Sequence, residues 1–162
     1  MSRLDGLSDV IDENQHAKRV LIDHHLDPME DFDLMISYPE ASSTCYLVAL
    51  LIERLYGAES ITKTMAENLF VGMMTDTGNF SFNSNYPEMY QIVGHLVALG
   101  VNKDAIYNLV FNAYSADRMR LMGYCLYQKM KIFPEYHTAL IYLSKKELYR
   151  FNFRSGDAEG IV

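Results

Sequence analysis

The chain has 162 residues, of which 49% are hydrophobic and 22% charged, a composition typical of a soluble globular protein. Its formal net charge of -7 excludes a broad basic surface for duplex DNA, because phosphate neutralisation needs clustered lysine and arginine. No apolar run approaches the roughly 20 residues that span a bilayer, and the N-terminus lacks a signal-peptide core, so we expect a cytoplasmic protein with no membrane partner.

The N-terminal third predicts a parallel α/β layer. A short amphipathic helix is expected over residues 7–14, followed by apolar runs at 18–23 and 32–37 that are typical of buried strands. A mostly apolar helix is expected over 45–57, and Gly57 suits its C-terminal stop. This order, strands followed by crossover helices, favours a parallel sheet.

The remainder is expected to be mostly helical and then to change character. The spacing predicts a helix that begins at 61, with Thr62 as its N-cap, and ends in the turn-forming TDTGNF. Helices are expected over 86–100, where Pro87 suits the first turn, and over 101–112 and 115–130. A strand over 136–144 and a short helix over 145–151 follow. A composition shift at 131–135 suggests a linker between two domains.

The first predicted strand ends in three titratable side chains, Asp23, His24 and His25. Ligands bind beyond the carboxyl ends of strands in open parallel sheets, and histidine nitrogen and aspartate oxygen both suit a divalent metal. Because successive side chains at a strand end point in different directions, one histidine is expected to bind metal and the other to face substrate. A solvated loop with incidental histidines is the alternative.

Two later motifs carry weaker signals. Asp76 ends an apolar run, where a capping or turn role is the ordinary explanation, and Thr75 and Thr77 could orient its carboxylate. Ser43 and Thr44 lie at the start of a predicted helix whose amides could bind an anion, although a simple N-cap explains them equally well.

Taken in order, VLIDHH, EASST and GMMTDTGNF resemble the DHH phosphoesterase family. The resemblance is strongest to its bacterial oligoribonuclease and pAp-phosphatase branch, which includes sequences called exopolyphosphatase-related. It implies an α/β fold: a parallel sheet with flanking helices, forming a partial DHH domain, followed by the start of a second small α/β domain. It also implies a two-ion manganese site, with magnesium or cobalt as alternatives.

The same resemblance implies roles for individual residues. His24 and Asp76 would bind one metal ion, Asp23 would support His24, and His25 would contact the scissile phosphate as the catalytic histidine. Ser43 and Thr44 match a family segment near the site and are candidate substrate contacts.

The family's first metal motif, its bridging aspartate and its glycine- and histidine-rich substrate motif have no match in this chain. We therefore expect a fragment of a longer protein, with a partial catalytic domain at 1–130 and a linker and the beginning of the substrate-binding domain at 131–162. This fragment is expected to be weakly active or inactive.

The expected reaction is hydrolysis of a short single-stranded oligonucleotide or of 3'-phosphoadenosine 5'-phosphate, a small phosphorylated nucleotide, by two-metal activation of water. Association into a homodimer is left open. Two other functions are also left open: an inorganic pyrophosphatase, and a non-catalytic nucleotide-binding or regulatory module with the same fold.

Overall fold

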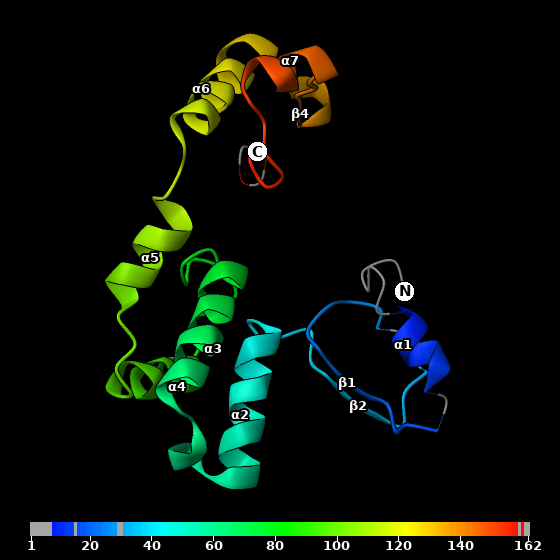
Figure 1. Ribbon diagram of the computed structural model, residues 1–162, viewed down its shortest axis with the longest axis vertical. Coiled ribbons are helices and arrows are strands. Elements are labelled where there is room, and N and C mark those ends of the chain that lie inside the picture. Colours follow the sequence, from blue (N-terminus) through cyan, green and yellow to red (C-terminus); the bar gives the residue numbers. More distant parts are fainter. Residues whose placement is uncertain (1–7, 15, 29–30, 159, 161–162) are drawn as a thin grey trace. The chain divides into compact units, whose positions relative to one another are not determined.

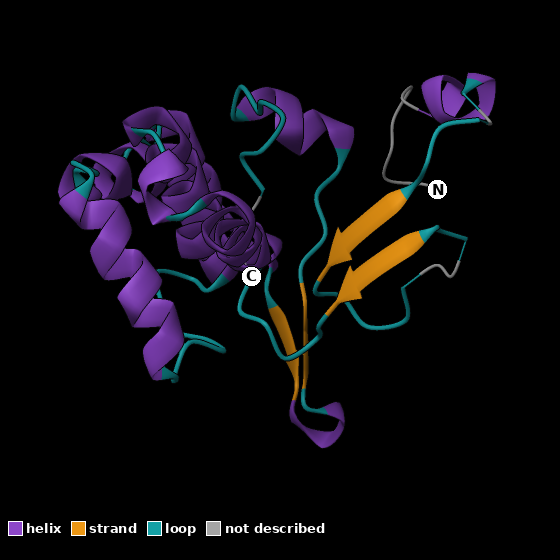
Figure 2. Ribbon diagram, turned by 90° about the horizontal axis from the view of Figure 1, so that it is seen from below, coloured by secondary structure: helices purple, strands orange, loops and turns teal. Residues whose placement is uncertain are grey.

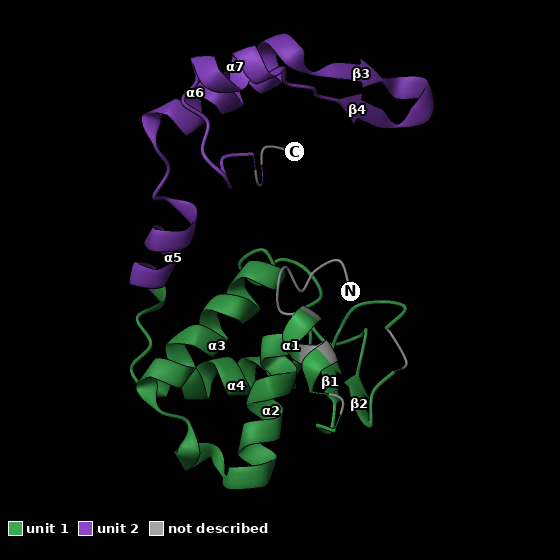
Figure 3. Cartoon of the chain, turned by 45° about the vertical axis from the view of Figure 1, so that its right-hand side comes forward, with its two compact units in different colours: residues 1–103 green, residues 104–162 purple. Residues whose placement is uncertain are grey.

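The computed structural model describes residues 8–14, 16–28, 31–158 and 160. The chain divides into two compact units, residues 1–103 and residues 104–162 (Figure 3). The first unit contains a two-stranded parallel sheet with helices, and the second contains helices and a two-stranded antiparallel hairpin. The predicted α/β class is confirmed. The predicted functional division at residue 131 stays a prediction.

The sheet of the first unit pairs β1 (Val20–Asp23) with β2 (Leu34–Ser37), as Figure 2 shows. The register runs in parallel from Val20 opposite Leu34 to Asp23 opposite Ser37. Both predicted strands are confirmed, each two residues shorter at its start. The described part of the connection between the strands, 24–28 and 31–33, contains no helix, and the register pairs the last residues of the two strands. Both strands therefore end together, and Asp23 and Ser37 share one edge.

Among the described residues of this unit, four α-helices accompany the sheet, with α2, α3 and α4 in mutual contact and α2 against β1 (Figure 1). Ser43 and Thr62 cap α2 and α3 through their hydroxyl oxygens, and Pro87 opens α4, as the sequence predicts. Residue 7 of the predicted first helix lies outside the described residues. The bounds are α1 (Ser8–Glu13), α2 (Thr44–Tyr56), α3 (Lys63–Asp76) and α4 (Pro87–Ala98), with a 3-10 turn at Ala58–Ser60.

The core of this unit lies between α2, α3 and α4. Its fully buried side chains are small or flexible ones around a single phenylalanine, a composition that fills irregular space between helices. They are Ala49, Ala66, Phe70, Met73, Met74, Met89 and Leu96. Burying this apolar surface holds α3 in place, so its last residue, Asp76, has a fixed position relative to the sheet.

Helices α2 and α3 lie close together at Gly72. A Cβ atom at this position would overlap the sulfur of Cys45 and lie 2.9 Å from the Cys45 Cβ. Gly94, in α4, is different: a Cβ there would meet open space. Gly72 is therefore required by packing, whereas Gly94 is not.

The second unit begins with α5 (Lys103–Phe111), whose first residue lies at the boundary between the units. The predicted helix over 115–130 is α6 (Ala116–Tyr124) continued by a π-helical turn (Cys125–Lys129), in which the Met130 amide donates to the Cys125 carbonyl. No helix among the described residues has the length and apolar character needed to cross a membrane.

A hairpin and a short helix follow. Strand β3 (Lys131–Phe133) pairs antiparallel with β4 (Thr138–Leu140) around a 3-10 turn at Pro134–Tyr136, and α7 (Lys145–Arg150) comes next. Residues 131–133 are thus part of a hairpin, where the composition suggested a linker. A small core surrounds Leu121 and Cys125, and both cysteines of the chain, Cys45 and Cys125, are free thiols.

Glu147 connects α7 to the end of α6. One carboxylate oxygen accepts hydrogen bonds from the Tyr124 hydroxyl and from the Lys129 ammonium, the latter at 2.9 Å. The other accepts from the Ser144 amide at 2.7 Å, and Ser144 in turn caps α7. The Tyr124 hydrogen bond, followed by those of Ser144 and Lys129, holds the pKa of Glu147 far below its ordinary 4.5.

The close contact at Gly72 makes a prediction about stability. Gly72→Ala should lower the free energy of unfolding by about 1–3 kcal/mol, because the added methyl group must displace α2 from α3. Gly94→Ala, the matched control in α4, should raise it by roughly 0.5–1 kcal/mol, since alanine is the better helix former. Urea denaturation of both variants measures the difference.

The sulfur of Cys45 supplies a further control on this contact. In a Cys45→Ala background, Gly72→Ala should cost less, because the overlapping sulfur atom is gone. A Gly72→Ala variant as stable as Gly94→Ala would contradict the packing account.

The Glu147 interactions make a prediction about pH. Because its folded-state pKa is depressed, the ionised carboxylate stabilises the second unit above pH 4.5, and this stabilisation should be lost progressively as the pH falls below that value. Glu147→Gln should be less stable at pH 7 and should lose this part of the pH dependence. Thermal unfolding of the wild type and the variant at pH 7 and pH 3.5 measures this pH dependence of stability. Glu135→Gln, at an exposed position in the same unit, should behave as wild type.

Candidate metal centre

Three segments of the first unit meet beyond the carboxyl end of β1: the end of the strand itself, the residues before α2, and the C-terminal end of α3. His24 joins them. Its Nδ1 lies 3.3 Å from the Ala41 carbonyl oxygen, and its Nε2 lies 3.5 Å from the Asp76 Oδ2. The predicted pair of metal ligands, His24 and Asp76, is thus brought together from positions 52 residues apart in the sequence.

The Ala41 contact decides which His24 nitrogen carries hydrogen. A carbonyl oxygen can only accept a hydrogen bond, so the contact requires hydrogen on Nδ1. In the neutral imidazole this leaves a lone pair on Nε2, the atom that faces Asp76. A backbone carbonyl on one nitrogen and a ligand position at the other is the usual arrangement of a metal-binding histidine.

Asp76 is the last residue of α3, and its carboxylate is about half exposed. The C-terminal end of a helix carries partial negative charge, so a carboxylate there is unfavourable unless a positive charge lies nearby. A protonated His24 could supply that charge in a simple ion pair. A bound cation would supply it more strongly and would use the Nε2 lone pair of His24 as well.

The separation of the two side chains suits a shared ion. Two donor atoms that each lie about 2.1 Å from one cation can be at most about 4.2 Å apart. The 3.5 Å between His24 Nε2 and Asp76 Oδ2 is within that limit. Within the described ranges, no group of three or more histidine, cysteine, aspartate or glutamate side chains could hold a metal. These residues therefore fit a cation as two of its ligands, and other ligands would have to complete the coordination.

Asp23 organises the turn that carries both histidines. Its Oδ1 accepts hydrogen bonds from the His25 ring Nδ1 at 2.6 Å, from the His24 amide at 2.8 Å and from the His25 amide at 3.2 Å. Burial raises the pKa of Asp23, but these hydrogen bonds, led by that of the His25 ring, outweigh it and leave the pKa below its ordinary 3.8. Asp23 thus directly orients His25, whose ring centroid lies 4.7 Å from that of His24.

The flanking threonines use their hydroxyl groups within their own helix. Thr75 donates to the Val71 and Gly72 carbonyls, and Thr77 donates to the Met73 carbonyl at 2.7 Å. Neither donates to Asp76 among the described hydrogen bonds. A role of these threonines in orienting the Asp76 carboxylate therefore stays a prediction that no described contact supports.

The residues that open α2 have an observed structural role. Ser43 is fully buried and its Oγ accepts from the Tyr46 amide at 3.0 Å, the N-cap that the sequence left open as the simpler explanation. Thr44 is the first residue of α2 and is partly exposed. A substrate contact by either residue stays a prediction.

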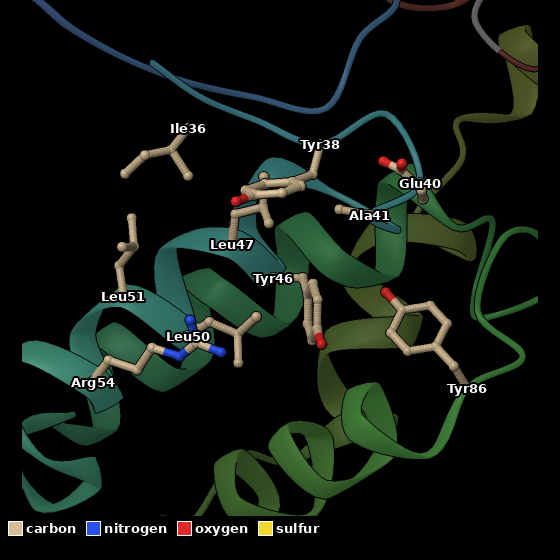
Figure 4. A pocket seen from close by; sticks show the side chains of 10 residues that line it. All are labelled: Ile36, Tyr38, Glu40, Ala41, Tyr46, Leu47, Leu50, Leu51, Arg54 and Tyr86. Atoms are coloured by element: carbon tan, nitrogen blue, oxygen red, sulfur yellow. The ribbon is translucent and has the colours of Figure 1, made fainter. Parts of the chain in front are cut away.

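A pocket of about 520 Å³ lies next to this region, between β2, α2 and the start of α4 (Figure 4). It is mostly apolar, and the rings of Tyr46 and Tyr86 meet edge to face within it at 5.5 Å between centroids. Ala41 lines the pocket and also contacts His24. The lining residues are Ile36, Tyr38, Glu40, Ala41, Tyr46, Leu47, Leu50, Leu51, Arg54 and Tyr86.

Sequence reasoning missed Ala41, because its contribution is a backbone carbonyl and no side-chain motif signals it. His95 and Glu53 form another partly buried histidine–carboxylate pair. His95 Nδ1 lies 3.7 Å from Glu53 Oε1, between α4 and α2. It provides a matched reference for the His24–Asp76 pair.

Known proteins resemble this chain over part of their length. The chain is 25% identical over 149 residues to the bifunctional oligoribonuclease and PAP phosphatase NrnA of Bacillus subtilis, covering 90% of this chain and 46% of that protein. It is 35% identical over 80 residues to the NrnA of Thermus thermophilus, covering 49% of this chain and 24% of that protein. No family model matches.

The crystal structure of an exopolyphosphatase-related protein from Bacteroides fragilis superimposes with a TM-score of 0.90 at 45% identity. The alignment covers 99% of this chain and 47% of that one, so the chain spans about half the length of this protein and of the Bacillus relative. Together these similarities support a DHH-like phosphoesterase.

The role of Asp23 can be tested in the turn itself. Asp23→Asn keeps the shape of the side chain but removes its charge, and charge-assisted hydrogen bonds exceed neutral ones by about 1 kcal/mol. Amide hydrogen exchange at His24 and His25, measured by NMR, should therefore quicken roughly fivefold. Asp27→Asn is the matched control: Asp27 is exposed in the same loop, and asparagine accepts its left-handed φ of 54°. Unchanged exchange in Asp23→Asn would contradict the assignment.

Proposed function

We propose that this chain carries part of the active site of a metal-dependent phosphoesterase, with His24 and Asp76 as two ligands of one divalent ion. The observation that supports this most directly is the His24 ring, with Nδ1 at the Ala41 carbonyl and Nε2 3.5 Å from Asp76. Manganese is the proposed ion, with magnesium or cobalt as alternatives, because imidazole and carboxylate ligands suit such ions.

The residues around this pair would have different roles in the hydrolysis of a phosphate ester. A bound divalent ion supplies Lewis acidity that offsets the negative charge of a phosphoryl group. His25, oriented by Asp23, would donate a hydrogen bond to the scissile phosphate. Asp23 would keep the turn in the conformation that presents both histidines at the end of β1.

The proposed substrates are short oligonucleotides or 3'-phosphoadenosine 5'-phosphate. The names of the Bacillus and Thermus relatives, oligoribonuclease and PAP phosphatase, support this choice. A net charge of -7 is also better suited to a short substrate held at one site than to a long duplex held along a basic track. The chain spans about half of the Bacillus relative. Hydrolysis of these substrates is therefore proposed for the protein of which this chain forms part of the active site.

Metal binding is the first test, and it does not depend on turnover. The two donors among the described residues should bind Mn(II) weakly, as measured by the loss of the free Mn(II) signal in electron paramagnetic resonance titrations. His24→Ala and Asp76→Asn should each raise the dissociation constant at least about tenfold, equivalent to about 1.4 kcal/mol. His95→Ala removes the His95–Glu53 pair and should leave the dissociation constant unchanged.

Turnover is the second test. With Mn(II), the chain should hydrolyse a dinucleotide or 3'-phosphoadenosine 5'-phosphate slowly, and His24→Ala should abolish this activity. Pyrophosphate as the preferred substrate would favour a pyrophosphatase. Mn(II) binding equal in wild type and His24→Ala would contradict the proposed ligand pair, and a protein that binds nucleotide without turnover would favour a non-catalytic module.

A further inference from the structure

The carbonyl that fixes His24 is itself held by a second side chain. The Asn83 Nδ2 donates to the Ala41 carbonyl oxygen at 3.1 Å, and lies 3.3 Å from the Glu40 carbonyl oxygen. A carbonyl oxygen has two lone pairs, so the Ala41 oxygen can accept from His24 and Asn83 together. Asn83 lies beyond the GMMTDTGNF motif, and no sequence pattern assigns it a role.

The backbone that leads to Asn83 has an unusual conformation. Gly78, Asn79 and Phe80 have consecutive positive φ angles of 55°, 58° and 62°, and Asn83 has a φ of 43°. Glycine and asparagine tolerate this region, but a bulky aromatic residue rarely enters it. Phe80 therefore marks a strained turn directly after Asp76.

Hydrogen bonds hold this turn in place. The Phe80 amide donates to the Thr77 Oγ1 at 2.8 Å, the Asn79 amide donates to the Met74 carbonyl at 2.7 Å, and the Ser84 hydroxyl donates to the Phe80 carbonyl at 2.8 Å. Strained conformations persist when the surrounding contacts over-determine them, and they are concentrated at functional sites. Here the strained turn returns the chain from the end of α3 to the segment before α2.

We propose that Asn83 is a positioning residue of the His24–Asp76 pair. Its side-chain amide fixes the direction of the Ala41 carbonyl, and that carbonyl fixes the tautomer and the orientation of the His24 ring. Helix α3 thus supplies Asp76 directly, and the strained turn after it positions His24 through Asn83. The consequence for metal affinity rests on the proposed function, whereas the consequence for the histidine tautomer does not.

The test uses the metal-free chain. Nitrogen-15 NMR of the histidine side chains should show His24 with hydrogen on Nδ1 in the wild type. Asn83→Gly keeps the left-handed backbone and removes the amide, and Asn83→Asp keeps the size and removes the donor. In both, the His24 nitrogen shifts should move toward the Nε2–H form that histidine prefers in water. Two variants are used in case one of them misfolds, and circular dichroism checks the fold of each.

Asn79→Gly is the matched control. It makes the same substitution at another left-handed asparagine of the same turn, and the side chain of Asn79 makes no described hydrogen bond. The His24 shifts should then match those of the wild type. His24 shifts that stay as in the wild type in both Asn83 variants would overturn the proposal.

Metal binding separates this proposal from the proposed function. If the wild type binds Mn(II), both Asn83 variants should raise the dissociation constant roughly three- to tenfold, since groups behind a ligand tune its affinity. An affinity equal to that of the wild type would overturn the positioning role. A wild type that binds no Mn(II), together with a tautomer change in the Asn83 variants, would support the Asn83 role and refute the metal site.

Discussion

The hydrogen bond between the His24 Nδ1 and the Ala41 carbonyl is the contact on which the candidate site depends. It ties the end of β1 to the segment before α2, and in a neutral His24 it leaves the lone pair on Nε2, the atom that faces Asp76. Without it, hydrogen could move to Nε2, and the two side chains could form only a hydrogen bond or an ion pair. Because the acceptor is a backbone atom, its position is set by the fold around it: the buried N-cap of Ser43 on one side and the amide of Asn83 on the other.

Much of the fold could be predicted because its elements have strong local signals. The apolar runs of β1 and β2 and the hydroxyl caps of α2 and α3 lie where the sequence places them. The misses have physical causes. Strand β3 is short and largely exposed, so it lacks the alternation that marks a half-buried strand. The π-helical turn after Tyr124 keeps a helical sequence pattern and changes only its hydrogen bonding.

The site was predictable where its chemistry lies in the side chains of the sequence motifs. It was unpredictable where it lies in a backbone carbonyl or in a side chain outside those motifs. Residue type at the end of a buried strand marks Asp23, His24 and His25, whereas the family resemblance implies the role of Asp76 as a ligand. The structure brings His24 and Asp76 together. A sequence does not show whether the hydroxyl groups of Thr75, Thr77 and Ser43 bond to nearby backbone atoms or to groups of the site. In the structure they bond to nearby backbone atoms. Ala41 and Asn83 depend on contacts across more than 40 residues, which no local pattern encodes.

The paired ends of β1 and β2 constrain how the chain can change length during evolution. Asp23 lies opposite Ser37, and side chains in a strand alternate between its two faces. One residue inserted within β1 would rotate the following side chains to the opposite face and carry the imidazole of His24 away from α3. A residue inserted at 31–33, in the described part of the connection to β2, would only lengthen that connection. Insertions and deletions among relatives should therefore accumulate in that connection and spare the four residues before the histidines.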